Sequence, residues 1–153
     1  MNLEYSGTES IPASKDTVWS FVTSPSAIAS CMPEVQSSKV IDDRTFDAVV
    51  GVAVGPVRGK FKFHVVLEPS PDRSKLGMRI SGGGLGSVVD LLASADLRED
   101  AGVTTLAWRG TATMRGPVAS IGGRVIDAQA KRVIETTFAN VKKRITAAPS
   151  TAG

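Results

Sequence analysis

The stretch Val57-Arg58-Gly59-Lys60-Phe61-Lys62-Phe63-His64-Val65-Val66-Leu67 decides the fold, because apolar and polar side chains alternate along it. One side of the stretch carries Val57, Gly59, Phe61, Phe63, Val65 and Leu67. The other side carries Arg58, Lys60, Lys62 and His64. A period of two predicts a β-strand with one apolar and one solvated face. We therefore expect an antiparallel sheet that packs on one side only.

The same period continues on both sides of this stretch. It predicts six consecutive strands at residues 35–41, 45–54, 57–67, 75–81, 87–98 and 103–114. Turn-forming residues such as Asp42-Asp43 and Gly55-Pro56 connect them, so successive strands are expected to be antiparallel neighbours. A further strand between Leu3 and Ile11 brings the predicted sheet to seven strands.

Three segments have helical spacing instead. Ser14 is a typical N-cap for a short helix, and a second short helical piece is expected around residues 27–31, ending at Pro33. A long helix is expected from Val118 to about Ile145, with Gly122 and Gly123 letting it approach the sheet closely. Its apolar stripe is Ile121, Val125, Ile126, Ala130, Val133, Ile134, Phe138, Val141 and Ile145.

Length and composition indicate one domain. The chain has 153 residues, of which 42% are hydrophobic and 22% charged; we assign residues 1–146 to the domain and 147–153 to a flexible tail or linker stub. No apolar stretch reaches the roughly 20 residues that cross a bilayer, and no secretory signal pattern is seen, so a cytoplasmic location is expected. The net charge of +3 is spread along the chain, which argues against nucleic-acid binding.

Groups that could do chemistry are scarce. His64 is the only histidine and is expected at the surface rather than in proton transfer, so no metal site or Ser/His/Asp set is predicted. Cys31, the only cysteine, is interpreted as a buried packing residue, with a thiol at a cavity mouth as the alternative. The glycine-rich run 82–86 lies between two strands, which favours a flexible hairpin tip over a phosphate loop. We therefore expect no catalysis.

Basic residues on the long helix have two interpretations. They form either a solvated helix face or a surface that docks on an anionic membrane, where each cation would contribute ~1 kcal/mol. The residues concerned are Lys131, Arg132, Lys142, Lys143 and Arg144.

The predicted order of one strand, two short helices, six strands and a long helix is that of the helix-grip fold of START-related proteins. Several motifs narrow the resemblance: Ile11-Pro12-Ala13 with Val18-Trp19 and Pro25, Cys31-Met32-Pro33, Val54-Gly55-Pro56-Val57 with Phe61, and Ile121-Gly122-Gly123-Arg124-Val125-Ile126-Asp127. Over about residues 3 to 145 the chain resembles the family of the carbon monoxide dehydrogenase G subunit, within the SRPBCC superfamily. This resemblance implies an α+β fold with a curved seven-stranded antiparallel sheet wrapped around the long C-terminal helix.

One helix cannot fill a strongly curved sheet, especially where inward positions are small, as at Ala93, Gly110 and Ala112. We therefore expect an apolar ligand cavity. Alternation along the strands shows which large residues point inward, but it leaves two interpretations for each of them, packed core or cavity wall. The predicted lining is Ile28, Met32, Val50, Phe61, Phe63, Met78, Leu91, Trp108, Met114, Ile121 and Val125.

The resemblance further implies a partner, a molybdenum-containing carbon monoxide dehydrogenase, and a peripheral place at the inner face of the cell membrane. We expect a non-catalytic carrier of an apolar molecule, preferably an isoprenoid quinone, with no covalent cofactor and a bound quinone or other lipid as the occupant. Two alternatives stay open. One is a recruitment or assembly scaffold for the dehydrogenase without a ligand, and the other is a cyclase- or aromatase-like enzyme of the same superfamily.

Overall fold

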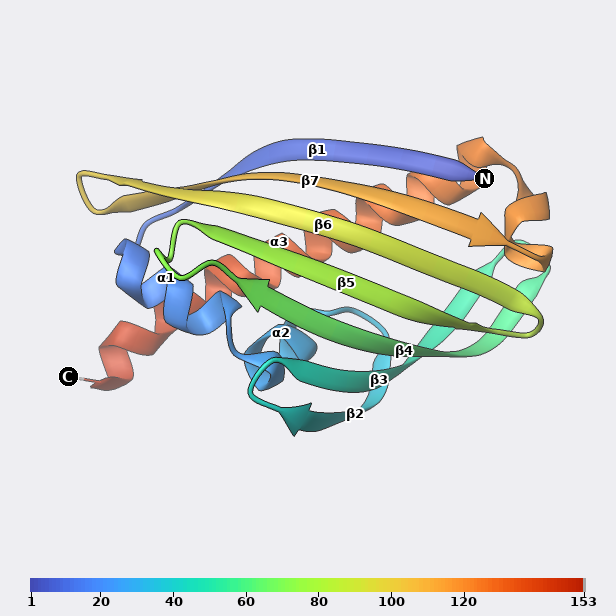
Figure 1. The fold of residues 1–153 in the computed structure, drawn as a ribbon, viewed down its shortest axis with the longest axis horizontal. Coiled ribbons are helices and arrows are strands. Elements are labelled where there is room, and N and C mark those ends of the chain that lie inside the picture. The colour runs from blue at the N-terminus through green and yellow to red at the C-terminus, as the bar shows by residue number, and fades with distance from the viewer. Residues whose placement is uncertain (153) are drawn as a thin grey trace.

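The computed structural model describes the backbone of residues 1–152 and the side chains of residues 1–147. Seven strands and two short helices precede a long C-terminal helix (Figure 1). The strands are β1 (Asn2–Ile11), β2 (Val35–Asp42), β3 (Thr45–Val54), β4 (Val57–Pro69), β5 (Lys75–Gly84), β6 (Ser87–Asp100) and β7 (Val103–Arg115). The helices are α1 (Lys15–Val22), α2 (Pro25–Cys31), the 3₁₀ helix η1 (Pro117–Ile121) and α3 (Gly123–Ala152).

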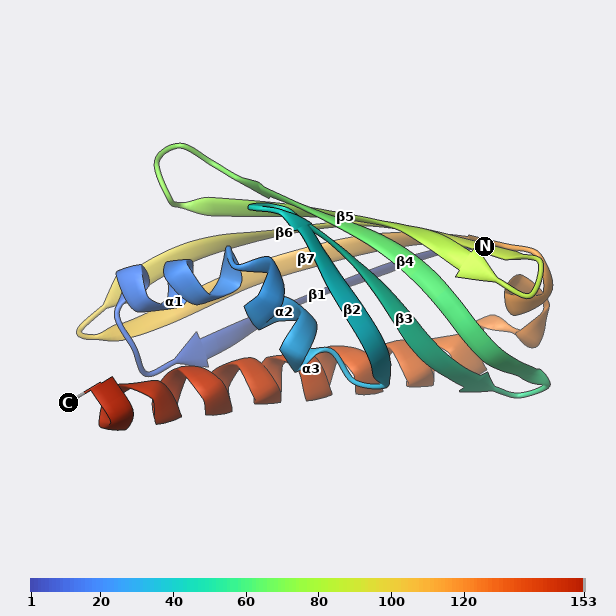
Figure 2. The same cartoon turned by 90° about the horizontal axis from the view of Figure 1, so that it is seen from below.

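All seven strands belong to one antiparallel sheet in the order β1-β7-β6-β5-β4-β3-β2. The six strands predicted from alternation begin at the predicted residues. Their ends lie at most three residues beyond the predicted ends, and the largest difference is in β5, which ends at Gly84 instead of residue 81. The long helix runs along one side of the curved sheet (Figure 2). The predicted α+β fold class is therefore confirmed.

The two short helices begin at serine caps. The Ser14 hydroxyl oxygen accepts a hydrogen bond from the Thr17 N–H at 3.2 Å, as the predicted N-cap requires. Ser24 caps α2 in the same way, so this helix begins at Pro25 rather than near residue 27. Proline fits the first helical position because its missing N–H would have no partner there.

The long helix begins and ends later than predicted. Residues 117–121 form η1, and Gly122, with a φ of 106°, makes the turn into α3. That conformation is the reason for glycine at this position. The predicted close approach at Gly122 and Gly123 is wrong, since a Cβ at either position would meet no atom within 4 Å. The helix also continues to Ala152, through most of the segment predicted as a flexible tail, while Gly153 lies outside the described residues.

Two separate apolar clusters join the helix to the sheet. The larger lies at the end with α1 and α2, and the smaller at the end with η1. The buried members of the larger cluster are Ile11, Val18, Trp19, Val22, Ile28, Ala29, Cys31, Phe46, Ala48, Val65, Leu67, Leu76, Leu97, Leu106, Val141 and Ile145. Those of the smaller cluster are Val57, Phe61, Val89, Val118 and Ile126. Ile126 and Val141 therefore anchor α3 at two places, with a stretch between them that belongs to neither buried cluster.

The glycine run between β5 and β6 is mostly strand. Gly82, Gly83 and Gly84 end β5, and the turn consists of Leu85 and Gly86, so the predicted hairpin tip is shorter than expected. A Cβ on Gly82 would lie 2.0 Å from the Lys62 carbonyl oxygen on β4. The glycines thus allow neighbouring backbones to approach closely.

Replacing Gly82 with alanine should destabilise the protein, because the new methyl group would collide with main-chain atoms of β4. We expect the free energy of unfolding, measured by urea denaturation, to fall by about 3 kcal/mol. Gly77→Ala on the same strand is the matched control, since its nearest new contact would be an ordinary 3.5 Å. The control should change stability by less than about 1 kcal/mol. Equal losses in both variants would contradict the close approach.

Candidate functional site

The middle of the concave side of the sheet is incompletely covered. Between the two clusters, apolar side chains from β3 to β7 and from α3 stay half-buried instead of buried. We name this set the inner zone; it consists of Val50, Val52, Phe63, Met78, Leu91, Trp108, Met114, Ile134 and Phe138. Solvent reaches part of each of these side chains, and six of the nine also pack against one of the two clusters.

Small side chains at the centre of the sheet cause this incomplete packing. Ala93 on β6 pairs in register with Gly110 on β7, and Ala95 pairs with Trp108. Alanine and glycine cannot reach across to the helix, and native interiors are otherwise densely packed. The α3 backbone makes its closer approaches to the sheet at β1 and β3, so the helix spans the concavity (Figure 2).

Trp108 is the largest side chain of the inner zone, and two neighbours fix its position. Its ring centroid lies 5.5 Å from that of Phe138 on α3, with the planes inclined by 32°. The indole also lies against Gly7 of β1, where a Cβ would come within 2.8 Å of the Trp108 Cζ2. Glycine at position 7 therefore makes room for the indole.

Two buried polar groups lie in this region. The Trp108 Nε1 has no hydrogen-bond partner within the described part of the chain, whereas the Tyr5 hydroxyl lies beside the Asp127 carboxylate of α3. Burial raises the pKa of Tyr5 to about 12, and the nearby Asp127 carboxylate on α3 adds to the rise. An unpaired buried donor costs about 1–3 kcal/mol, so a ligand that brings an acceptor would be favoured here.

The predicted lining residues fall into three groups. Six belong to the inner zone, and Met32 and Ile121 lie half-buried beside the larger and the smaller cluster. The six are Val50, Phe63, Met78, Leu91, Trp108 and Met114. Ile28 and Phe61 are buried inside the clusters, so they are core rather than wall. The prediction that Val125 lines the cavity is wrong, because this side chain is 47% exposed.

The start of α3 explains the error at Val125. The helix turns Ile126 toward the sheet, and the preceding residue then points about 100° away. Val133, from the predicted stripe, is exposed for the same reason. Tyr5 and Gly7, in contrast, were missed by the sequence analysis. Their shared parity with Leu3 on the first strand is the signal that places them on the inner side.

Acid, base and metal-binding groups do not gather in the inner zone. His64 lies on the outside of the sheet, as predicted, with its Nδ1 2.6 Å from the Asp47 carboxylate. Cys31 is fully buried in the larger cluster, which confirms the packing interpretation, and burial raises the pKa of its thiol. Among the residues whose side chains are described, no three His, Cys, Asp or Glu are grouped to hold a metal ion.

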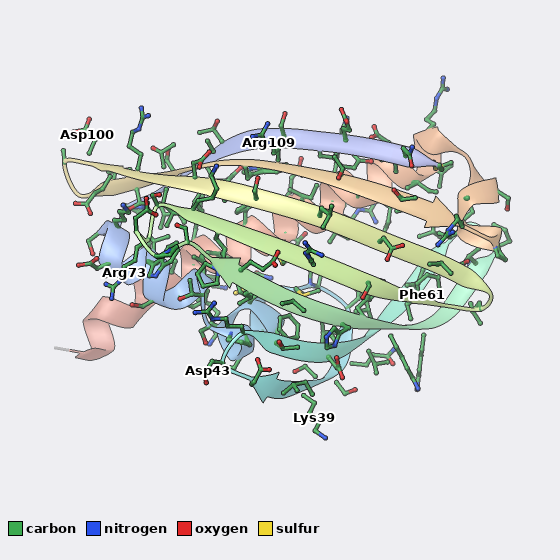
Figure 3. The ribbon with its side chains drawn as sticks, in the orientation of Figure 1. Lys39, Asp43, Phe61, Arg73, Asp100 and Arg109 are labelled. Atoms are coloured by element: carbon green, nitrogen blue, oxygen red, sulfur yellow. The ribbon has the colours of Figure 1, made fainter. Side chains whose placement is uncertain are left out.

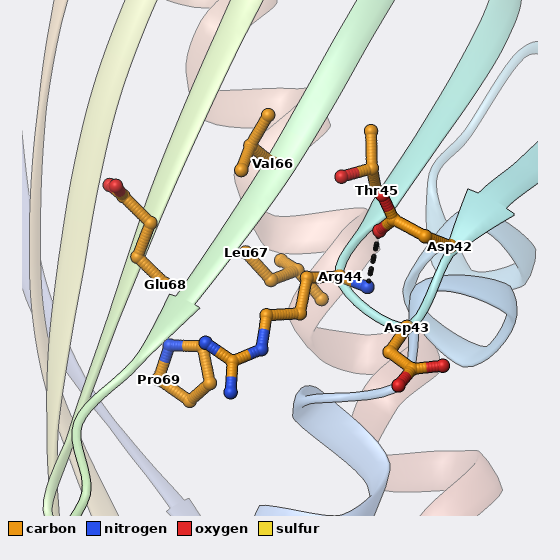
Figure 4. Close-up of a pocket in the computed structure, with 8 residues that line it drawn as sticks. All are labelled: Asp42, Asp43, Arg44, Thr45, Val66, Leu67, Glu68 and Pro69. Atoms are coloured by element: carbon orange, nitrogen blue, oxygen red, sulfur yellow. Dashed lines mark hydrogen bonds between the residues drawn. The ribbon is translucent and has the colours of Figure 1, made fainter.

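A solvent-open hollow lies at the β2–β3 turn, away from the inner zone (Figure 4). The Arg44 N–H donates a hydrogen bond of 2.9 Å to Asp42, which lowers the pKa of that carboxyl. The full lining is Asp42, Asp43, Arg44, Thr45, Val66, Leu67, Glu68 and Pro69. These are contacts of an ordinary polar turn, so we do not assign a function to this hollow.

The basic residues of α3 are partly engaged within the molecule. Lys142 forms an ion pair of 2.9 Å with Glu9, and Lys131 forms one of 3.2 Å with Asp127. Arg144 lies over the Phe21 ring at 5.9 Å and donates a hydrogen bond to Ser30. Within the described side chains, Arg132 and Lys143 have no ion pair.

A long helix held by a curved antiparallel sheet, with an apolar inner surface, defines a START-related helix-grip protein. A conserved protein from Geobacillus kaustophilus superposes with a TM-score of 0.85 at 23% identity, covering 94% of this chain and 95% of that one. A START superfamily protein from Mycobacterium smegmatis gives 0.71 at 14%, covering 94% and 97%. The Zhui aromatase/cyclase from Streptomyces sp. R1128 gives 0.69 at 14%, covering 95% and 94%. At these identities the likeness shows the fold alone.

Residues 7–146 match the family of the carbon monoxide dehydrogenase G subunit (CoxG), and the chain belongs to this family. The predicted resemblance is thereby confirmed. A search of curated proteins finds no match. Family and fold together indicate a ligand-binding or carrier role.

Tyr5 is the only tyrosine, so its ionisation can be followed by ultraviolet absorbance. We expect a midpoint near pH 12 in the folded protein, against the ordinary value of 10.0 in the unfolded chain. Between these two pH values the folded state keeps the Tyr5 proton, whereas the unfolded chain has lost it. The contribution of Tyr5 to the stability of the fold is therefore complete below pH 10 and is lost as the pH rises toward 12. Asp127→Asn should lower the midpoint only in part, because burial is the larger cause. An ordinary midpoint in the folded protein would contradict the burial of this hydroxyl.

Proposed function

We propose that the protein is a non-catalytic carrier that holds an isoprenoid quinone in the inner zone, between α3 and the middle of the sheet. The observation that carries this proposal is an apolar, half-buried surface containing a buried donor without a partner, the Trp108 Nε1. A quinone combines an apolar ring and tail with two carbonyl oxygens that accept hydrogen bonds. Its chemistry therefore suits both features.

The inner zone offers separate contacts for the two parts of such a ligand. Phe63, Met78 and Leu91 supply apolar surface, whose burial against a ring or tail contributes about 25 cal/mol per Å². Trp108 would donate to a carbonyl oxygen and so remove the cost of its unpaired N–H. Small residues such as Ala93 and Gly110 leave room for the ring.

The proposal includes no reaction, because acid–base catalysis requires groups that converge on a substrate. Of the two carboxylates near the helix, Glu9 pairs with Lys142, and Asp127 pairs with Lys131 and lies beside the Tyr5 hydroxyl. This supports a carrier over the cyclase-like alternative. Conversion of a polyketide-like substrate by the purified protein would instead favour that alternative.

The partners in the proposal come from the family. Its name links the chain to carbon monoxide dehydrogenase, and an enzyme that oxidises carbon monoxide must pass electrons to an acceptor. In the proposed role, the carrier meets the inner face of the membrane through its own surface and moves quinone between the bilayer and a molybdenum-type dehydrogenase. Among the helices of the described residues, none has an apolar stretch that could span a bilayer.

Quenching of Trp108 fluorescence tests whether quinone occupies the inner zone. Trp19→Phe leaves Trp108 as the only tryptophan, and short-chain ubiquinone should then quench it in a saturable way with one site per chain. Ala93→Leu adds a bulky side chain beside Gly110 and should weaken binding at least about fivefold, since overpacking costs 1–3 kcal/mol.

Ala107→Leu is the matched control, because Ala107 is exposed on β7 and its side chain points away from the helix. Its affinity for quinone should be unchanged. Equal weakening by both substitutions would contradict the proposed location. A folded protein that shows no saturable quenching would overturn the carrier and favour the scaffold for the dehydrogenase.

A further inference from the structure

Basic side chains gather at one end of the molecule. One end brings together the start of β1, the β3–β4 turn, the β5–β6 turn, the end of β7 and η1 (Figures 1 and 2). We name it the η1 end; its segments are 51–63, 81–89 and 111–126. Together with residues 1–4 and Asp90, they contain five cations and two acids, Glu4 and Asp90. The cations are Arg58, Lys60, Lys62, Arg115 and Arg124.

These cations are largely free of ion partners. Arg115 has a carboxylate, Asp90, at a long 4.0 Å, and within the described side chains the other four form no ion pair. The opposite end carries both signs of charge, and Figure 3 shows Asp43, Arg73 and Asp100 toward it, away from Phe61. Its turns and the strand residues beside them carry the acids Asp42, Asp43, Asp72, Glu99 and Asp100 and the cations Arg44, Arg73, Lys75 and Arg98.

Apolar side chains are exposed among the cations of the η1 end. Leu85 is 54% exposed in the β5–β6 turn and has a φ of 56°, a conformation that leucine rarely adopts. Its side chain lies against Gly59, where a Cβ would be 2.8 Å from the Leu85 Cδ1, so it lies beside the backbone between Arg58 and Lys60. Val88 on the same hairpin is 39% exposed.

A leucine at this turn is difficult to explain by folding alone. The turn would accept asparagine or glycine more readily at a positive φ, and the Leu85 side chain remains half in solvent. Val88 is paired in register with Arg115, so exposed apolar and basic side chains alternate on this end. Such a mixture matches a lipid surface, where apolar side chains contact the acyl chains and basic side chains bind the phosphates.

We propose that the η1 end docks on an anionic lipid bilayer, with Leu85 and Val88 entering the apolar boundary and Arg58, Lys60, Lys62 and Arg115 meeting the phosphates. The proposal rests on the carrier function and names the surface that faces the membrane. It differs from docking through the α3 cations, three of which are already engaged with Glu9, Asp127, Phe21 and Ser30.

Sedimentation with lipid vesicles, without added quinone, tests this surface. The unmodified protein should bind vesicles of phosphatidylglycerol and phosphatidylcholine, and bind phosphatidylcholine alone much more weakly. Leu85→Asn should preserve or raise stability, since asparagine tolerates the positive φ, yet lower vesicle affinity about tenfold. The matched control is Leu92→Asn, because Leu92 is 56% exposed on the outer face of β6; its vesicle affinity should be unchanged.

Paired charge variants separate the two candidate surfaces. Arg58→Gln with Lys60→Gln should lower affinity for anionic vesicles more than tenfold, at about fivefold for each cation. Arg132→Gln with Lys143→Gln on α3 should leave it unchanged. The proposal would be overturned by absence of vesicle binding, by equal binding to neutral vesicles, or by loss only in the α3 variant. Binding to heparin is a further control. If the protein binds heparin as strongly as vesicles, and Leu85→Asn does not weaken that binding, the surface is a general anion-binding patch and the proposal is overturned.

The two proposals can fail separately. Quinone quenching of Trp108 is measured without vesicles, and vesicle binding is measured without quinone. A protein that binds vesicles through Leu85 but shows no saturable quenching would keep the docking surface and lose the carrier. The reverse result would keep the carrier and remove this surface.

Discussion

The long helix α3 is held against the sheet near two places, and the apolar side chains between them stay half-buried. Ile126 packs into the cluster at one end, and Val141 and Ile145 pack into the cluster at the other. Ala93 and Gly110 lie at the centre of the sheet, where larger residues would be needed to reach the helix. A solid core at both ends thus keeps the protein folded while the middle stays incompletely packed. The inner zone follows from this constraint.

The same division gives the two ends of the molecule different surfaces. At the end with α1 and α2, a large buried cluster stabilises the fold, and the turns around it carry both acidic and basic residues. At the η1 end, the buried cluster is smaller, and the turns around it are basic and carry the exposed Leu85. A carrier needs a stable framework, an apolar interior and a surface that recognises where its ligand is exchanged. In the proposed function, different segments of one small domain meet these three requirements.

Sequence patterns predicted the sheet well and the interior only in part. Strand starts could be predicted because a sheet with one solvated face cannot shift by one residue without burying charge. The inward side of α3 was less predictable, since the φ of Gly122 sets where the helix begins, and Val125 then points outward. The contact of Gly7 with Trp108 joins the first strand to the last, so it depends on a pairing that no local pattern contains. Half-burial of the inner zone likewise depends on how the whole sheet curves.

Native mass spectrometry after incubation with a long-chain isoprenoid quinone, followed by organic extraction, tests the central claim most directly. The account predicts a folded protein carrying one quinone per chain, recovered intact by extraction and therefore held without a covalent bond. A folded protein that remains at its bare mass with quinone in excess would contradict the account. The incompletely packed middle would then be a feature of the fold without a ligand, and the family link to the dehydrogenase would have to rest on surface contacts alone.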